Sequence, residues 1–241
     1  KAKTSIYRST DKGINWEQTF TQNNEELFDI VLTPGKPDNI FVVGSLLLRS
    51  RDGGTTWQDL TYRIPIKPDH KISRLALALS DSIPGLILVF TESYDTLTPG
   101  VWAHQLFRST NDGRDYFRIG IDYLPFVSYW KMELQISPTD PAEFYLGGIW
   151  FNKYRLEADS AIHLDFRNHK YHKDVRDLLV FKGDTADVVF MGNDGGVTRS
   201  DDGTVTWRDI TRNGMQSTQL HNITIGDNSN MVYGGPQDGN L

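Results

Sequence analysis

A short motif recurs along the chain and constrains its fold more than any other feature of the 241 residues. Each copy begins with Arg-Ser, has Asp or Asn two positions after the serine, and ends on an aromatic residue seven positions after it. The copies span 8–16, 49–57, 108–116 and 199–207, and Arg155 marks a degenerate copy. The marker arginines therefore repeat every 41 to 59 residues. This periodicity predicts an array of similar small units rather than one irregular core.

A second unit lies between the copies of this motif: an apolar stretch, a polar turn and another apolar stretch. Its copies are 30–44, 75–91, 132–148, 178–192 and 223–235. In Met132, Leu134 and Ile136 the apolar side chains alternate with polar ones, as in a strand that buries one face. Each period thus holds two hairpins of short antiparallel strands. Four strands per period predict an all-β fold, a β-propeller with four-stranded antiparallel blades.

The number of hairpins gives the expected extent of the propeller. We expect residues 1–241 to form one domain or propeller segment with about five blades' worth of strands, as part of a larger propeller. The expected hairpins lie near 1–20, 27–60, 73–119, 131–166, 176–210 and 220–241. A five-bladed ring closed by the two ends of the chain is the alternative.

The composition narrows the classes of partner and chemistry. The chain carries a formal charge of −6 and has no run of basic residues longer than two, which argues against a nucleic-acid partner. It has no cysteine, so disulfides, thiolate metal ligands and a cysteine nucleophile are excluded. No apolar run is longer than that of 86–90, which is too short to span a membrane. We expect no metal, no cofactor and no membrane span.

The recurrent motif, Ser-x-Asp-x-Gly-x-x-Trp, resembles the Asp box of BNR-type propellers, a group that includes sialidases, xyloglucanase-type glycosyl hydrolases and sortilin-like receptors. The third copy departs from the pattern at Asn111 and Tyr116, and the fourth has Thr204 in place of glycine, so we expect its turn to differ. The matching residues are Ser9, Asp11, Gly13, Trp16, Ser50, Asp52, Gly54, Trp57, Ser109, Asn111, Gly113, Tyr116, Ser200, Asp202 and Trp207.

We interpret the box residues as structural. Short Ser and Asp side chains hydrogen-bond nearby backbone N–H groups, glycine allows a positive φ, and the aromatic ring packs on the blade. Because one copy belongs to each blade, Asp11, Asp52 and Asp202 cannot converge on one substrate. The function is instead expected on the opposite face, in the loops between the second and third strands and between consecutive blades.

The loop face supplies the candidate site residues. Asn193-Asp194 and Gln237-Asp238 occupy equivalent loops of adjacent blades, so Asp194 and Asp238 are candidate catalytic carboxylates. Ordinary tight-turn chemistry also explains these four residues, so that alternative stays open. Further candidate ligand-binding residues are the aromatic, amide, imidazole and carboxylate side chains of Trp102, His104, Trp150, Asn152, His172 and Asp174.

Three functions follow from the resemblance and these candidates. The first is an extracellular, cell-surface or periplasmic module of bacterial type that presents its loop face to a protein or polysaccharide ligand. The second is a xyloglucanase-type glycoside hydrolase, whose site would need further blades or a second propeller from the same or another chain. The third is a sialidase, because Tyr62-Arg63-Ile64-Pro65 resembles the motif whose arginine binds the sialate carboxylate.

Overall fold

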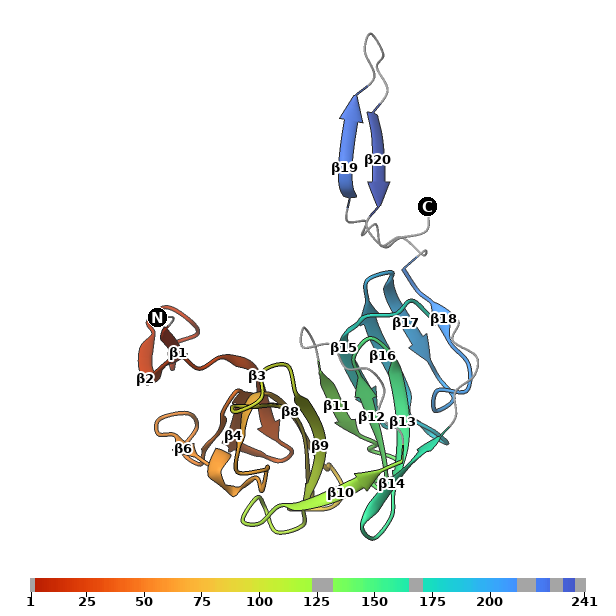
Figure 1. The fold of residues 1–241 in the computed structure, drawn as a ribbon. Coiled ribbons are helices and arrows are strands. Elements are labelled where there is room, and N and C mark those ends of the chain that lie inside the picture. The colour runs from red at the N-terminus through yellow and green to blue at the C-terminus, as the bar shows by residue number, and fades with distance from the viewer. Residues whose placement is uncertain (1–2, 123–131, 165–170, 212–219, 226–231, 237–241) are drawn as a thin grey trace.

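The computed structural model describes residues 3–122, 132–164, 171–211, 220–225 and 232–236. Its strands follow one another as antiparallel hairpins, as the repeat predicts (Figure 1). They are β1 (Lys3–Arg8), β2 (Glu17–Asn23), β3 (Leu27–Thr33), β4 (Lys36–Gly44), β5 (Leu47–Ser50), β6 (Gln58–Asp59), β7 (His70–Leu79), β8 (Ile87–Asp95), β9 (Trp102–Ser109), β10 (Phe117–Ile121), β11 (Glu133–Ile136), β12 (Glu143–Gly147), β13 (Phe151–Leu156), β14 (Ser160–Leu164), β15 (Val175–Phe181), β16 (Val188–Asn193), β17 (Gly196–Ser200), β18 (Arg208–Asp209), β19 (Leu220–Ile225) and β20 (Val232–Pro236). A short 3-10 helix spans Thr61–Arg63.

Sixteen of these strands form four antiparallel blades: blade I (β3–β6), blade II (β7–β10), blade III (β11–β14) and blade IV (β15–β18). The hairpin β1–β2 precedes blade I, and the hairpin β19–β20 follows blade IV. The predicted all-β propeller fold with four-stranded antiparallel blades is confirmed. One departure from separate blades is a short parallel pairing of β10 with β14, at Gly120 with Ser160 and Ile121 with Ala161.

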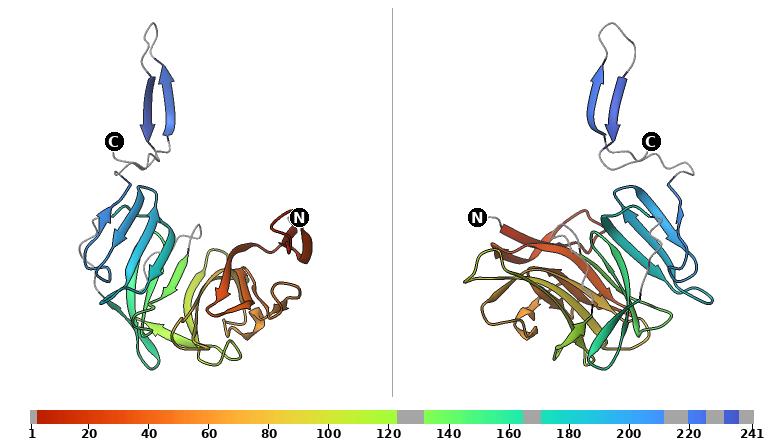
Figure 2. Two further views of the ribbon diagram at one scale, coloured as in Figure 1. Left: turned by 180° about the vertical axis from the view of Figure 1, so that it is seen from behind. Right: turned by 45° about the vertical axis from the view of Figure 1, so that its right-hand side comes forward.

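The four blades stand side by side (Figure 2), and the hydrophobic core lies between consecutive blades rather than inside any one of them. Phe41 and Leu47 of blade I pack against Leu75 and Val89 of blade II. Blades II and III share the largest cluster, and Tyr145 and the side chains around it join blade III to blade IV. Each fully buried Leu, Ile or Phe contributes roughly 1.5–3 kcal/mol. The stacking of blades therefore supplies most of the fold's apolar burial.

The four box turns share one hydrogen-bond pattern. In each, the serine Oγ accepts from the backbone N–H four residues later, at 2.8 to 3.0 Å. The Asp or Asn Oδ1 accepts from the backbone N–H four residues after itself, at 2.9 to 3.1 Å. Thr204 follows this pattern with a φ of 81°, beside 84° at Gly54. The expectation that the Thr204 turn differs is therefore wrong: the hydrogen bonds hold threonine in the glycine conformation.

The box aromatic residues pack backward onto the preceding strand pair or blade. Trp57 donates its Nε1–H to Thr19 Oγ1 of β2 at 3.0 Å, and Trp207 lies edge-on to Phe151 of blade III. Trp16, the first of the series, is 62% exposed. The box turns thus stabilise their own hairpins, and the aromatic residues Trp57 and Trp207 also contact the element before them. No helix among the described residues is long and apolar enough to cross a membrane.

Candidate functional site

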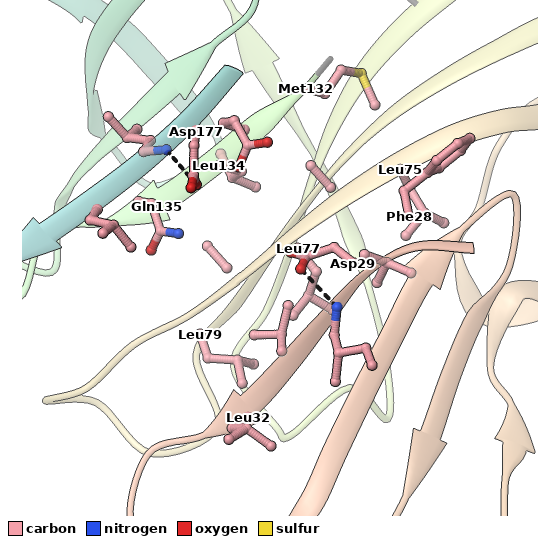
Figure 3. Close-up of a pocket in the computed structure, with 18 of the residues that line it drawn as sticks. Phe28, Asp29, Leu32, Leu75, Leu77, Leu79, Met132, Leu134, Gln135 and Asp177 are labelled. Atoms are coloured by element: carbon pink, nitrogen blue, oxygen red, sulfur yellow. Dashed lines mark hydrogen bonds between the residues drawn. The ribbon is translucent and has the colours of Figure 1, made fainter. Parts of the chain in front are cut away.

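The innermost strands of the four blades surround a channel of about 880 Å³ (Figure 3). Its walls are β3, β7, β11 and β15, one strand from each blade. Leu32, Leu77 and Leu134 are among the apolar side chains that line it. All four blades contribute to this concave feature, and ligands commonly bind in such features.

Four charged residues of the innermost strands line this channel, and we call them the charged ring: Asp29, Arg74, Glu133 and Asp177. Each comes from a different innermost strand, so every blade supplies one of them. Their partners on the second strands are Val43, Glu92, Gly147 and Gly192 respectively. Each blade thus contributes one charged side chain to a channel whose other lining residues are mostly apolar.

A β-bulge precedes the ring residue in three of the four blades. The pairing register shifts between Leu27 and Asp29, between Ile72 and Arg74, and between Val175 and Asp177. Ile72 packs toward blade I, and without a bulge the residue two positions later would face the same way. The extra residue turns Arg74 to the other face. Bulges that re-aim side chains are common next to functional sites.

Arg74 is the cation of the ring and is 9% exposed. Its guanidinium lies over the Phe28 ring, 4.2 Å from the centroid. Burial lowers the pKa of the Arg74 guanidinium, while the nearby carboxylates of Glu133, Glu92 and Glu26 oppose that shift. An arginine stays protonated under these conditions, so Arg74 neutralises part of the surrounding negative charge.

The two ring aspartates have matching conformations. Asp29 Oδ1 accepts from the backbone N–H of Ile30 at 2.7 Å, and Asp177 Oδ1 accepts from that of Leu178 at 2.9 Å (Figure 3). Both residues are exposed to the channel. The described hydrogen bonds use one oxygen of each carboxylate, and Leu178 and Ile30 hold the groups in place. Both aspartates therefore present negative charge from opposite ends of the row of blades.

The lining as a whole is acidic. Among the residues that the structure describes, five carboxylates and one cation, Arg74, line the channel, which gives this part of the lining a net charge of about −4 at neutral pH. The carboxylates are those of Glu26, Asp29, Asp81, Glu133 and Asp177. A channel with one sign of charge and low-dielectric walls concentrates ligands of the opposite sign.

Asp194, a predicted catalytic candidate, is ion-paired with Arg176 of β15. Arg176 Nη2 donates to Asp194 Oδ2 at 2.6 Å, and Arg176 Nε donates to Oδ1. Hydrogen bonds from Arg176 hold the pKa of the Asp194 carboxyl below its usual range. Asn193 Oδ1 beside it accepts from the Gly195 N–H at 2.9 Å. Gln237 and Asp238, the paired candidates, lie outside the described residues, so their meeting with Asp194 stays a prediction.

His104 takes part in a polar row that crosses blade II. Its Nε2 lies 3.1 Å from Glu92 Oε2, and Ser73 Oγ donates to Glu92 Oε1 at 2.9 Å. Glu92 is 3% exposed and pairs in register with Arg74. Trp102 is 53% exposed and tilts against Tyr94. His104 therefore connects to the charged ring through Glu92, whereas Trp102 lies at the free end of β9.

The remaining loop candidates sit on blades III and IV. Lys173 Nζ lies 4.2 Å from the centroid of the Trp150 ring, and Asn152 Oδ1 lies 2.9 Å from His163 Nε2. His172 Nδ1 lies 2.9 Å from the backbone oxygen of Lys173. Asp174 has a positive φ of 63°, and its N–H donates to the Ile149 oxygen. Trp150 and Asp174 thus contact the segment that joins blades III and IV, whereas the Asn152 side chain contacts His163 within blade III, and all four candidates lie outside the described channel lining.

Arg63, of the sialidase-like motif, lies away from the channel. Its Nη1 donates to the Gly113 oxygen at 3.2 Å and its Nε to Tyr62 Oη at 3.1 Å. Arg63 thus contacts the box turn of blade II. Among the residues that the structure describes, no group of three or more His, Asp or Glu side chains is arranged to hold a metal ion.

The sequence analysis did not predict the charged ring, because it placed the candidate site residues in loops. A signal does exist in the sequence. Within each innermost strand, one charged residue directly precedes an apolar residue, as in Asp29-Ile30, Arg74-Leu75, Glu133-Leu134 and Asp177-Leu178. Aligning the repeats on their first strands, rather than on the box, would have brought these four positions into register.

Comparisons with known proteins support the fold. No protein-family model matches the sequence, and no curated protein matches it. Similar solved structures include an ancestral GH74 enzyme (TM-score 0.56, 16% identity, 86% of this chain and 28% of that one). Another is YCF48 bound to D1 peptide, with a TM-score of 0.52 and 14% identity over 92% of this chain and 62% of that one. A third is a Hadza microbial sialidase, with a TM-score of 0.52 and 17% identity over 84% of this chain and 50% of that one. This chain spans less than two thirds of each.

Proposed function

We propose that this chain is an extracellular propeller-type binding module that holds a basic segment of a protein ligand at the mouth of its channel. The charged ring carries this proposal, because three of its four members are carboxylates and the whole lining has a net negative charge. A lysine or arginine side chain suits such a site. Its methylene groups can lie along apolar wall residues while its charged end meets the ring.

Two further observations support a protein ligand. The innermost strands position the ring on rigid backbone, so the site is organised before a ligand arrives. One structural neighbour, YCF48, was solved with a peptide bound, so a related arrangement of strands accommodates a peptide. Electrostatic attraction to the exposed carboxylates would speed the association of a basic segment, and added salt would weaken its binding.

A glycan ligand is the second candidate, and the exposed Trp102 favours it. This ring lies at the start of β9 against Tyr94, where an aromatic surface can stack on a sugar. A xyloglucanase-like activity has weaker support. The general acid of such an enzyme needs a raised pKa, but Arg176 lowers the pKa of Asp194.

A sialidase activity has the least support in this geometry. Recognition of a sialate carboxylate calls for arginine side chains that converge on the substrate. Arg63 binds the box turn of blade II, and Arg74 is the one arginine in the described lining of the channel. The acidic lining would repel an anionic sugar.

The binding proposal is tested with a fluorescent lysine-rich peptide, and with a glutamate-rich peptide of equal length as the negative probe. We expect the lysine-rich peptide to bind the full chain and the glutamate-rich peptide not to bind. The Asp29→Asn/Asp177→Asn double variant should bind the lysine-rich peptide about tenfold more weakly, since each lost charge removes roughly 0.5–1 kcal/mol.

A matched control distinguishes the effect of the ring carboxylates on peptide binding from the effect of the protein's net charge. Asp159 and Asp184 are exposed carboxylates outside the channel lining, so Asp159→Asn/Asp184→Asn changes the net charge by the same amount. We expect this control to bind like the unchanged protein. Equal weakening in both double variants would mean that overall charge, and not the ring, attracts the peptide.

A further inference from the structure

Blade IV ends the described row of blades with an uncovered apolar face. We call the side of a blade toward the following blade its trailing face. The trailing face of blade IV carries Leu179, Phe181, Phe190 and Arg199. Leu179 is 52% exposed and Phe181 is 53% exposed, whereas the trailing faces of blades I, II and III are buried in the interblade clusters.

The trailing face of blade IV repeats a feature of the covered faces. In blade I, the guanidinium carbon of Arg49 lies 4.9 Å from the centroid of the Phe41 ring. In blade III, Lys153 Nζ lies 5.8 Å from that of Tyr145. Arg199 lies 5.0 Å from that of Phe190. A cation on the third strand over a ring on the second strand is thus common to these faces.

At the covered faces this cation reaches into the next blade. Arg49 Nη1 donates to the Asp112 backbone oxygen at 2.8 Å, and Lys153 Nζ donates to the Gly203 oxygen at 3.5 Å. Both acceptors lie in the box turn of the following blade, and both stand directly before its last left-handed residue. Arg199 instead bonds Asp201 of its own blade, with Nε 2.7 Å from Oδ1. Blade IV therefore carries the elements of a blade-binding face without a following blade upon it.

The length of the connecting segments identifies which strands belong there. Between β6 and β7, β10 and β11, and β14 and β15, the chain passes from the outermost strand of one blade to the innermost strand of the next. Those connections span 60–69, 122–132 and 165–174, and the connection from β18 to β19 spans 210–219. All four have ten or eleven residues. By this measure β19 is the innermost strand of a fifth blade.

The pairing of β19 with β20 gives an independent match. The register shifts between Leu220 and Asn222, as it does before the ring residues of β3, β7 and β15. Asn222 pairs with Gly235, just as Asp177 pairs with Gly192. Asn222 therefore occupies in β19 the position that Asp177, a member of the charged ring, occupies in β15.

We propose that β19 and β20 form the two inner strands of a fifth blade that packs on the trailing face of blade IV. In this arrangement the backbone position of Asn222 extends the charged ring by one member. The β19–β20 ladder stands apart from the four blades in Figure 1, so the proposal describes an arrangement other than the one drawn.

A disulfide experiment tests this docking, because the chain has no cysteine of its own. A Cβ added at Gly147 of blade III would lie 3.2 Å from Val175 Cβ of blade IV. The equivalent pair across the proposed interface is Gly192 and Leu220. Under mild oxidation at low protein concentration, we expect Gly192→Cys/Leu220→Cys to form an intramolecular disulfide, measured by intact mass and free-thiol titration.

Two control pairs define the outcome. Gly147→Cys/Val175→Cys reports a covered interface and should close under the same conditions. Gly192→Cys/Ile225→Cys joins the face to the far end of β19 and should keep its thiols free. The proposal is overturned if Gly192→Cys/Leu220→Cys stays reduced, if it forms only dimers, or if the Ile225 pair closes equally well.

A measurement without new cysteines guards against variants that fail to fold. Phe181→Asp places a charge on the trailing face at a position that is already half exposed. If β19–β20 docks there, backbone amide exchange in 220–225 and 232–236 should become at least severalfold faster while exchange in blades I to III is unchanged. Unchanged exchange in those strands would contradict the docking.

Discussion

Thr204 shows how strongly a local hydrogen-bond network can override a residue's own preference. A β-branched residue with a φ of 81° is strained, and the Thr204 Oγ1 is buried without a hydrogen-bond partner. The turn persists because the Thr204 N–H still bonds Ser200 Oγ at 2.9 Å. The remaining bonds, from Thr206 to Asp202, are those of the other box turns.

This strain gives a prediction with its reverse as a control. Thr204→Gly should stabilise the fold by about 1 kcal/mol, because it removes the strain and the unpaired hydroxyl at a smaller cost in chain entropy. Gly54 has a φ of 84° in the equivalent turn, so Gly54→Thr should destabilise by a similar amount. Urea unfolding of both variants measures the two effects. A neutral Thr204→Gly would show that the threonine is not strained.

Asp52 gives a second prediction, on acid stability. Hydrogen bonds from the Thr56 hydroxyl, the Thr56 N–H and the Ser50 hydroxyl lower the pKa of Asp52 to about 2. The unfolded value is about 3.9, so the stability that Asp52 contributes is present above about pH 4 and is lost as the pH falls toward 2. Asn111 occupies the same position in blade II and its Oδ1 accepts the same kind of bond.

Asp52→Asn should therefore keep the turn and remove its titration. Urea midpoints measured between about pH 5 and pH 2 should fall less steeply in Asp52→Asn than in the unchanged protein. Asp184→Asn, at an exposed carboxylate, should leave the slope unchanged. An identical slope in Asp52→Asn would mean that this carboxylate does not contribute to acid unfolding.

At the scale of single strands, basic side chains of one blade hydrogen-bond to the next blade. Arg49 is 4% exposed at its side chain and forms an ion pair with Asp112 at 2.7 Å. Its Nε also donates to Asn39 Oδ1 at 2.7 Å. The Arg49 side chain of β5 thus joins Asn39 of β4, in its own blade, to the box turn of blade II.

Arg51 provides a matched control for this contact, because its Nη2 reaches the same Asp112 oxygen at 3.5 Å while its side chain is 65% exposed. Arg49→Ala should destabilise the protein by about 2–3 kcal/mol, since it removes the hydrogen bonds that the buried Arg49 makes to the buried Asn39 and to the Asp112 turn. Arg51→Ala should cost less than about 0.5 kcal/mol. Equal effects on the urea midpoint would contradict a specific role for Arg49 between the blades.

The sequence predicted the blades better than the site for a physical reason. The box turns are held by hydrogen bonds within nine residues, so Ser50 to Trp57 could be interpreted without knowing the fold. The ring depends on pairing register and on bulges, and its members Asp29 and Arg74 are far apart in sequence. A bulge such as that before Arg74 reverses which face a side chain occupies, and alternation alone does not predict it.

The described part of the molecule includes a row of four blades, and in our account its function depends on the channel that their innermost strands line. The structure places the box turns at the outer strands and the ring on the innermost strands. Asp194 and the aromatic residues of the loop face lie outside the described lining. In our account they contribute at most to the edge of a ligand whose basic part is held by the ring.

Backbone amide hydrogen exchange of the full chain, with and without the lysine-rich peptide, tests this account most directly. We expect slower exchange in bound protein at 26–29, 72–74, 132–133 and 175–177, where the ring and its bulges lie. The box turns at 9–16 and 50–57 should exchange as before. Protection at the box turns or on the outer strands, with none at the innermost strands, would contradict the assignment of the channel mouth as the binding site.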